Sequence, residues 1–469
     1  MSRPSDLCTA TLVEVATLVK HKKISPVELA EAMLARIQRL DAKLHSYITV
    51  TDELALQQAR TAERDIDKGE YRGPLHGIPI GIKDVFCTQG IRTTGAATPL
   101  RNWVPDYNAT VVEKLSMAGA VFLGKQSLTE WSFGGYPSWL AAPVNPWGST
   151  FWTGESSSGS GVATAAGLCF GALGTDAGGS IRYPSSCNGI VGLKPSLGRV
   201  SQYGCLPVTP SLCVIGPMAR SVADTAVLLQ VIAGFDIVDP ISRREAIPNY
   251  LREAYKGVNG MRIGIDAEYC TTNVDPQVSG AVLATTSIFK QLGATVREVK
   301  LEGLTDAKVA WRAIIAAEMA VAYHRHYSVD PSAFNPILRA FLAKGYTIRG
   351  TDCARAYAEQ QLWRRRLEKL YEDIDLLLCP IMLRPFPQED FSETHAEEMW
   401  ESILTYQQFS GPFNLAGTPS IVVPCGSSDQ GMPLALQLVG RYNEEATVLR
   451  AAHAYEQATE WHTKRPPVG

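Results

Sequence analysis

The feature that most constrains the fold is a series of short, branched apolar segments separated by segments of helical periodicity. Helices are expected at 53–68, 276–292 and 446–459, and a further helix begins at Ser25-Pro26, where Ser25 caps and Glu28 completes a capping box. The strand-like segments lie at 120–124, 262–266, 294–301, 375–378, 420–424 and 434–440. Strands that alternate with helices indicate an α/β protein with a largely covered sheet.

The domain organisation follows from what interrupts this pattern. The 469 residues contain no internal repeat, low-complexity tract or linker, which favours a single domain over residues 1–469. Residues from about 235 to 350 are richer in charge and in helical periodicity. We expect this region to form a helical cap or insertion over one face, which would be the active-site face.

Charge and hydropathy exclude several classes of partner. The net charge is −3 without a basic block, so nucleic acid and anionic membrane are not expected as partners. The longest weakly polar run, 161–174, is too short and too rich in glycine to span a bilayer, which needs about 20 apolar residues. The ten cysteines form no C-x-x-C pair, and no export signal is recognised. These observations predict reduced thiols in a cytoplasmic protein without a metal site.

Familiar nucleotide and histidine motifs are incomplete. Gly119 to Lys125 begins like a phosphate-binding loop, but Gln126 stands where a Ser or Thr must hold magnesium. No G-x-S-x-G nucleophile elbow and no H-E-x-x-H zinc motif is found.

Three segments remain as candidates for chemistry: Lys83 in GIPIGIKDV, the serines of TGESSSGSG at 153–161, and Ser180 in GTDAGGSIRYPSS. Taken singly, each has an ordinary interpretation. Lys83 would be a surface lysine, the serines a flexible loop and Ser180 a turn residue.

Taken together, the three segments resemble the amidase signature family. The serine- and glycine-rich stretch 154–201, which contains G-G-S-I-R-x-P at 178–184, carries most of the resemblance. The other similar segments are GIPIGIKD (77–84), IGPMARSVADTA (215–226), FNLAGTPSIVVPCG (413–426) and PLALQLVGRYNEEATVLRAA (433–452). The resemblance covers nearly the whole chain and is weakest over 235–400. It implies an α/β fold with a large mixed, twisted β-sheet covered on both faces by helices, and no cofactor.

The resemblance also implies a Ser–cis-Ser–Lys triad. Ser180 would be the nucleophile, Ser156 a bridging serine in a cis peptide, and Lys83 the base. Asp176 and Arg182 would be structural supports. The oxyanion hole would be formed by backbone N–H groups of Ala177, Gly178, Gly179 and Ser180.

A lysine base explains why no histidine is needed. A serine hydroxyl is a weak nucleophile until a base takes its proton, and lysine can do so only when neutral. With an ordinary pKa of about 10.4, neutral lysine costs about 4.6 kcal/mol at pH 7. Burial lowers a lysine pKa, and Lys83 ends an apolar strand-like segment. One departure from the family is Glu155, where a second glycine usually precedes the serines.

The expected activity is hydrolysis of small neutral amides through a Ser180 acyl-enzyme, with aryl amides or anilides, carbamates (urethanes) and esters as candidate substrates. The aromatic residues Trp131, Phe133, Tyr136 and Trp139 would line the acyl pocket. Such a pocket offers no positive charge for the carboxylate of glutamine.

Two other functions remain open. One is the glutamine-hydrolysing component of an amidotransferase, which releases ammonia for misacylated tRNA; it resembles the chain in the same segments and would require a partner protein. A non-catalytic scaffold is the second alternative, although intact Lys83, Ser156 and Ser180 argue against it. Members of the family are often homodimers, so a homodimer is a candidate assembly.

Overall fold

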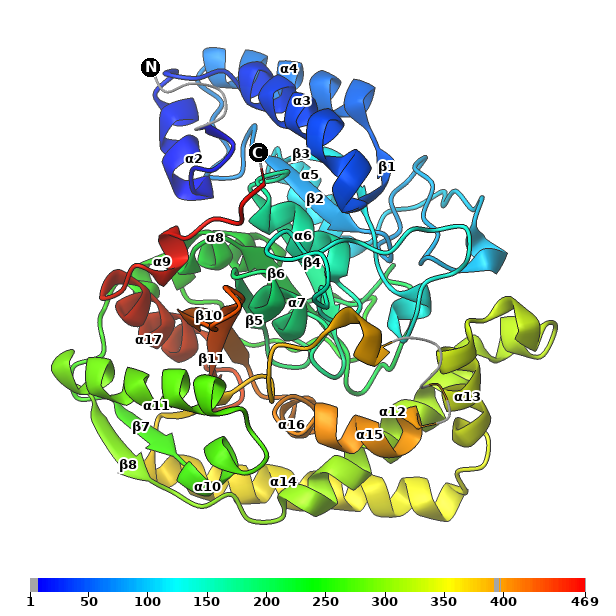
Figure 1. The fold of residues 1–469 in the computed structure, drawn as a ribbon. Coiled ribbons are helices and arrows are strands. Elements are labelled where there is room, and N and C mark those ends of the chain that lie inside the picture. The colour runs from blue at the N-terminus through cyan, green and yellow to red at the C-terminus, as the bar shows by residue number, and fades with distance from the viewer. Residues whose placement is uncertain (1–6, 392–395, 397, 469) are drawn as a thin grey trace.

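The structure is a computed structural model that describes residues 7–391, 396 and 398–468. Within them, eleven strands form one mixed sheet in the order β1-β3-β2-β4-β6-β5-β10-β11-β9-β7-β8 (Figure 1). The strands are β1 (Tyr47–Val50), β2 (Pro79–Lys83), β3 (Val121–Gln126), β4 (Gly171–Asp176), β5 (Val191–Lys194), β6 (Val214–Ala219), β7 (Arg262–Ile265), β8 (Thr295–Glu298), β9 (Leu376–Pro380), β10 (Ser420–Ser427) and β11 (Pro433–Gly440). Two groups of three parallel strands, β3–β2–β4 and β9–β7–β8, flank an antiparallel centre, and β1 pairs antiparallel with β3 at one edge.

The central strands are covered on both faces. Every residue of β2, β4, β6 and β11 is buried. Because successive side chains of a strand point to opposite faces, complete burial requires cover on each side. Helices α6 (Ser158–Ala165) and α7 (Arg182–Cys187) pack together on these strands, and α8 (Val222–Ile232) and α17 (Glu445–Gln457) pack together on the other face. The predicted α/β fold with a covered mixed sheet is therefore confirmed.

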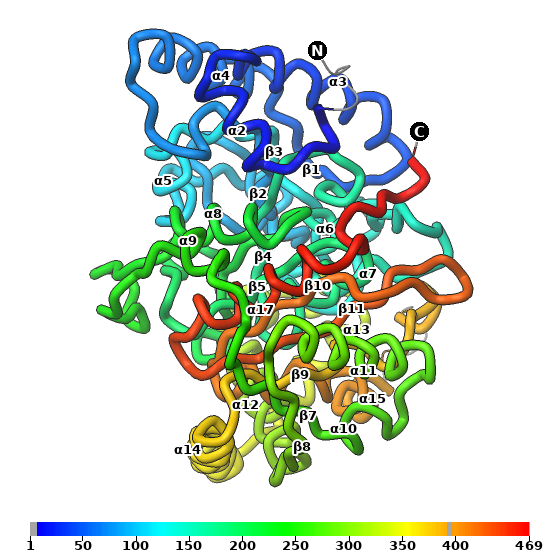
Figure 2. The backbone as a smooth tube through the Cα atoms, turned by 90° about the vertical axis from the view of Figure 1, so that its left-hand side faces the viewer, coloured from blue at the N-terminus to red at the C-terminus, as the bar shows by residue number. Residues whose placement is uncertain are grey.

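Among the other helices, α2, α3 and α4 lie at one end of the molecule and α10 and α14 at the other, as Figure 2 shows from the side. Helices α3 and α4 pack on β3 and α2 packs on α8, whereas α10 and α11 pack on β9 and α14 packs on α12 and α16 (Figure 1). Their bounds are α2 (Leu12–Lys20), α3 (Pro26–Leu44), α4 (Asp52–Asp67), α5 (Thr110–Met117), α9 (Tyr250–Ala254), α10 (Ala267–Thr271), α11 (Pro276–Gln291), α12 (Leu304–Tyr327), α13 (Pro336–Gly345), α14 (Gly350–Asp373), α15 (Met399–Tyr406) and α16 (Gly411–Ala416).

Local sequence signals agree well with these bounds. The Ser25 hydroxyl accepts a hydrogen bond from Val27 N, and the Glu28 carboxylate accepts one from Ser25 N, so the predicted capping box forms at the start of α3. The apolar run 161–174 divides into the end of α6 and the beginning of β4. Within the described residues, no helix has the length and apolar character needed to cross a bilayer.

Residues 235–350 contribute to the sheet as well as to its cover. They contain β7 and β8 at one edge of the sheet, together with α12 and α13. The Trp311 indole of α12 donates a hydrogen bond of 2.8 Å to Ala177 O, next to the predicted oxyanion turn. A cap made by this region would therefore consist of α12 and α13, because the strands are part of the sheet itself.

Candidate active site

Lys83 is the last residue of β2, and its side chain is completely buried. Strand β2 runs parallel to β4, with Ile82 beside Leu173, so the carboxyl end of β4 lies next to Lys83. Ligand and catalytic groups commonly gather at the carboxyl ends of parallel strands. The sheet topology thus brings Lys83 beside the segment that leads to Ser180.

Two hydroxyl groups hold the ammonium of Lys83. Lys83 Nζ donates hydrogen bonds to Ser156 Oγ (2.8 Å) and to Thr175 Oγ1 (2.7 Å). Ser157 Oγ is instead bonded to the backbone of Thr175, and Ser158 Oγ lies 2.7 Å from the Tyr136 hydroxyl. Of the three neighbouring serines, Ser156 is therefore the one in contact with Lys83.

The backbone at Ser156 differs from what the resemblance implied. Every peptide bond between described residues is trans, including those on both sides of Ser156. A non-proline cis bond costs about 3 kcal/mol, and the Ser156 hydroxyl reaches Lys83 Nζ without it. The expectation of a cis peptide at this serine is thus contradicted by the structure.

Ser180 lies in the turn between β4 and α7, and its side chain is 7% exposed. Among the described residues, the hydrogen bonds of Ser156 Oγ lead to Lys83 and not to Ser180 Oγ. Catalytic hydrogen bonds often become short and well aligned only in the complex with substrate.

Asp176 holds the turn that carries Ser180. Its carboxylate accepts hydrogen bonds from Gly179 N (2.8 Å) and Ile181 N (3.2 Å), on either side of the serine. Gly179 has φ +119°, and a Cβ there would lie 2.3 Å from Tyr183 Cε2. A side chain at this position would be strained and would collide with the tyrosine ring.

The turn offers three unused amide donors. The N–H groups of Ala177, Gly178 and Ser180 find no acceptor among the described residues, whereas the N–H of Gly179 is already donated to Asp176. Backbone donors fixed around one point are the usual means of stabilising an oxyanion.

Arg182 holds the Asp176 carboxylate in place. The Nε and Nη2 atoms of Arg182 each lie 3.0 Å from an oxygen of Asp176, and both side chains are fully buried. Burial raises the pKa of Asp176, but the charge and hydrogen bonds of Arg182 outweigh it and hold that pKa well below its usual range. Arg182 also binds Gln437 and Asn414, so segments far apart in sequence stabilise the turn.

Burial has the effect on Lys83 that a lysine base requires. It lowers the pKa of Lys83 to about 8, although Cys213, Cys205, Glu155 and Asp176 favour the charged form. At pH 7 the neutral amine then costs about 1.4 kcal/mol rather than about 4.6 kcal/mol.

An aromatic cavity lies beside the turn. Tyr183 and Gln407 line it, and these side chains also lie within 3.3 Å of the position of a Cβ at Gly179 or Gly178. Its free volume is about 30 Å³. We call its lining residues the cavity wall: Phe133, Gly134, Trp152, Glu155, Tyr183, Ile337, Phe386, Phe391, Met399, Ile403, Tyr406 and Gln407.

Of the four aromatic residues that the sequence suggested for the pocket, Phe133 belongs to the cavity wall. Trp131 packs instead against Tyr323, with ring centroids 4.9 Å apart. Trp139 lies under the guanidinium of Arg101. Tyr136 is bonded to Ser158 behind the serine cluster. Sequence proximity to the serines was thus a poor guide, because Trp131, Tyr136 and Trp139 each pack against a different part of the structure.

Several functional candidates were missed from the sequence. Thr175 is recognisable only once β4 is placed parallel to β2. Three further aromatic residues come from a segment where the family resemblance was weakest or absent: Phe386, Phe391 and Tyr406. Their grouping with Trp152 depends on the tertiary fold.

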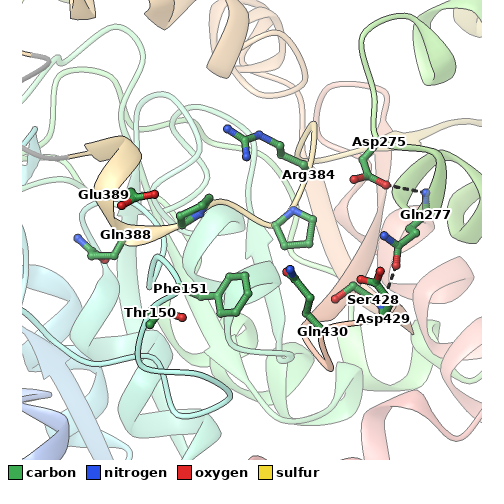
Figure 3. Close-up of a pocket in the computed structure, with 12 residues that line it drawn as sticks. Thr150, Phe151, Asp275, Gln277, Arg384, Gln388, Glu389, Ser428, Asp429 and Gln430 are labelled. Atoms are coloured by element: carbon green, nitrogen blue, oxygen red, sulfur yellow. Dashed lines mark hydrogen bonds between the residues drawn. The ribbon is translucent and has the colours of Figure 1, made fainter.

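A larger, open depression lies outside the cavity wall and includes none of the triad candidates. Figure 3 shows Arg384, Asp275 and Gln430 around it, with Phe151 at its side. Its volume is about 740 Å³. The segment 384–391 separates the two spaces, because Arg384 and Glu389 line the depression while Phe386 and Phe391 line the cavity.

Comparison with known proteins connects these groups to a family. The family model described as Amidase matches residues 28–449. The chain is 39% identical, over 97% of its length and 96% of the other protein, to a Mycobacterium tuberculosis (strain ATCC 25618 / H37Rv) protein named "Putative amidase AmiD". It is 37% identical, over 98% and 99%, to one of the subunits of the glutamyl-tRNA(Gln) amidotransferase of Geobacter sp. (strain M21). A solved structure described as a bacterial aryl acylamidase of the amidase signature family superposes with a TM-score of 0.87, at 25% identity, over 97% of this chain and 98% of the other.

Proposed function

The chain belongs to the amidase signature family and is an amide-hydrolysing enzyme, and from this premise we propose that Ser180, Ser156 and Lys83 are its catalytic triad. The observation that carries the proposal is the buried hydrogen bond between Lys83 Nζ and Ser156 Oγ, beside the turn that bears Ser180.

The proposed reaction begins with proton transfer. Neutral Lys83 accepts a proton from the Ser156 hydroxyl, and Ser156 takes one from Ser180 as Ser180 Oγ attacks the amide carbonyl. Thr175 Oγ1 keeps the lysine amine oriented through its own hydrogen bond. The N–H groups of Ala177, Gly178 and Ser180 receive the negative charge that develops on the carbonyl oxygen.

The C–N bond then breaks. The proton on Lys83 returns through Ser156 to the leaving nitrogen, which departs as an amine or ammonia. A water molecule attacks the Ser180 ester with the same relay as base, and the acid product and free Ser180 result. Carbamates and esters fit the same sequence of steps, because each has an acyl carbon and a leaving group that accepts a proton.

The residues of the cavity wall favour binding of substrates with an apolar group over binding of glutamine. Its described residues include no Lys, Arg or His, and Glu155 adds negative charge. A carboxylate placed there would be unpaired, which is costly in a closed pocket. The free volume is small, so an aromatic acyl group enters only if side chains of the wall rotate. We therefore propose small amides with alkyl or aryl groups as substrates, with aryl carbamates and esters as further candidates.

The experiment that tests this proposal compares kcat/KM for a neutral aryl amide and for L-glutamine, with the isolated chain. We expect the aryl amide to be hydrolysed at least tenfold faster. Faster hydrolysis of glutamine would favour the amidotransferase function, which the 37% identical relative makes the main alternative. In that case, co-expression should also recover a partner protein.

A second assay separates an enzyme from a scaffold. A fluorophosphonate probe should label the wild-type chain at Ser180, since such probes react with activated serine hydroxyls. A chain that is neither labelled nor active on any amide, carbamate or ester would support the non-catalytic alternative.

Location and assembly complete the proposal. All ten cysteines are free thiols, which supports a cytoplasmic enzyme acting on a small molecule. The homodimer suggested by the family resemblance stays a prediction, and sedimentation velocity would test it.

A further inference from the structure

Glu155 is the acidic residue of the cavity wall, and it directly precedes Ser156. Its side chain is half-buried, so part of it reaches the free space of the cavity. The proposed relay uses the side chains of Lys83, Ser156 and Ser180, so it requires no carboxylate at this position.

The surroundings of this carboxylate are aromatic. Trp152 and Phe391 stack with ring centroids 3.9 Å apart, and the Tyr183 ring lies 5.8 Å from Trp152. Phe386 and Tyr406 meet edge to face at 5.3 Å. Such walls cannot replace the water that solvates an ionised carboxylate.

Within the described residues, no Lys, Arg or His forms an ion pair with Glu155. Burial raises the pKa of Glu155 to about 7, against the effect of a backbone hydrogen bond from Gly134 and the charge of Lys83. The Lys83 amine acts on Glu155 through its charge, but its hydrogen bonds go to Ser156 and Thr175. This half-buried carboxylate therefore has no directly paired cation among the described residues.

We infer that Glu155 binds the ammonium group of an amine-bearing amide substrate. The carboxylate supplies the counter-charge, and the faces of the surrounding rings attract the same cation. The small free volume of about 30 Å³ suits a primary ammonium on an alkyl chain, whereas a guanidinium or a ring enters only if side chains of the wall rotate. A metal ion is not favoured as the occupant, because hard cations need several oxygen ligands and the rest of the wall is mainly aromatic and aliphatic.

This inference rests on the proposed function and narrows its substrate class. The preferred substrate is an ω-amino amide, whose ammonium enters the cavity while its carbonyl reaches the turn at residues 177–180. Neutral amides with an alkyl group remain substrates but lack the ion pair.

The test uses matched pairs of substrates that differ only in charge. Primary amides of ω-amino acids with about three to six carbons are compared with alkanamides in which a methyl group replaces the ammonium. We expect kcat/KM for the best amine to exceed that of its neutral partner at least tenfold in the wild-type enzyme. The ratio should fall to about one in Glu155→Gln and be largely retained in Glu155→Asp, which keeps the charge.

The ratio cancels any effect of these substitutions on Lys83, since both substrates of a pair use the same base. Glu389→Gln is the matched control, because Glu389 belongs to the segment that separates the two spaces but lines the outer depression (Figure 3). The control should leave the ratio unchanged.

A second readout does not depend on turnover. n-Alkylammonium ions should slow fluorophosphonate labelling of Ser180 at least tenfold more effectively than alcohols of the same length, and Glu155→Gln should remove this difference. A ratio near one in the wild type, or one unaffected by Glu155→Gln, would overturn the inference. Labelling of Ser180 together with hydrolysis of neutral amides would still uphold the proposed function in that case, whereas loss of both would remove the proposed function as well.

Discussion

The polar cluster at the strand ends and the cavity wall beside it are neighbours, yet they are held in place by different forces. The polar cluster consists of Lys83, Ser156, Thr175 and Ser180, which include the three residues that we propose as the catalytic triad. Its groups are buried and fixed by hydrogen bonds of 2.7 Å and 2.8 Å around Lys83, and by Asp176 within the turn. The cavity wall is held by contacts between aromatic rings and by aliphatic packing.

This difference predicts how each region responds to amino-acid substitution. Hydrogen bonds are directional, so a single lost hydroxyl or amine in the cluster interrupts the whole relay. Apolar packing is non-directional and roughly additive in area, so a smaller side chain in the wall weakens binding by degrees. The cluster should therefore control kcat in an all-or-none manner, and the wall should control KM gradually.

The largest expected effect comes from Ser180→Ala. The substitution removes the nucleophile, and we expect kcat to fall by about three orders of magnitude or more, with loss of fluorophosphonate labelling and an unchanged fold. Ser185→Ala is the matched control, because Ser185 is buried in α7 and its hydroxyl has no partner among the described residues. Activity above a few per cent of wild type in purified Ser180→Ala would contradict the assignment of the nucleophile.

Lys83→Ala and Ser156→Ala test whether the cluster acts as a unit. Each should lower kcat by orders of magnitude, and the double variant should be little worse than either single one, because both remove the same relay. Ser157→Ala serves as control, since Ser157 is bonded to the Thr175 backbone and not to Lys83. Losses that multiply would show two independent roles.

The pH dependence of kcat/KM should report Lys83. Burial lowers the pKa of Lys83 to about 8, and only the neutral amine accepts a proton. The rate should therefore rise about tenfold per unit below pH 8 and level off above it. A profile that is flat from about pH 6 to 10 would argue against a lysine base.

The smallest effect is expected in the wall. Phe386→Leu shortens a buried ring that contacts Trp152 and Tyr406, and we expect KM for an alkyl amide to change about threefold to tenfold with kcat nearly unchanged. Phe289→Leu removes the same atoms from a buried site against Tyr455 and provides the control for stability. A fall in kcat as large as that of the cluster variants would erase the distinction between the two regions.

Much of the fold was accessible from local sequence. The expected strands and helices recur within a few residues of their predicted bounds, because apolar periodicity and caps such as Ser25 act over one turn or one strand. Strands β1, β4, β5 and β6 were not anticipated, since their pairing partners are set by the sheet and their segments are short or rich in glycine.

The sequence by itself determined the chemical groups: a lysine at the end of an apolar strand, a serine cluster and a Gly-Gly-Ser turn, all recognisable because they depend on neighbouring residues. Only the tertiary structure decided that Lys83 is bound by Thr175 as well as Ser156, and that the peptide bonds at Ser156 are trans. It also decided that Phe386 and Tyr406 surround Glu155 while Trp131 and Trp139 turn away. The physical reason is that these contacts join segments far apart in the chain, such as Arg182 and Gln437, and their geometry arises from packing against the sheet rather than from any local pattern.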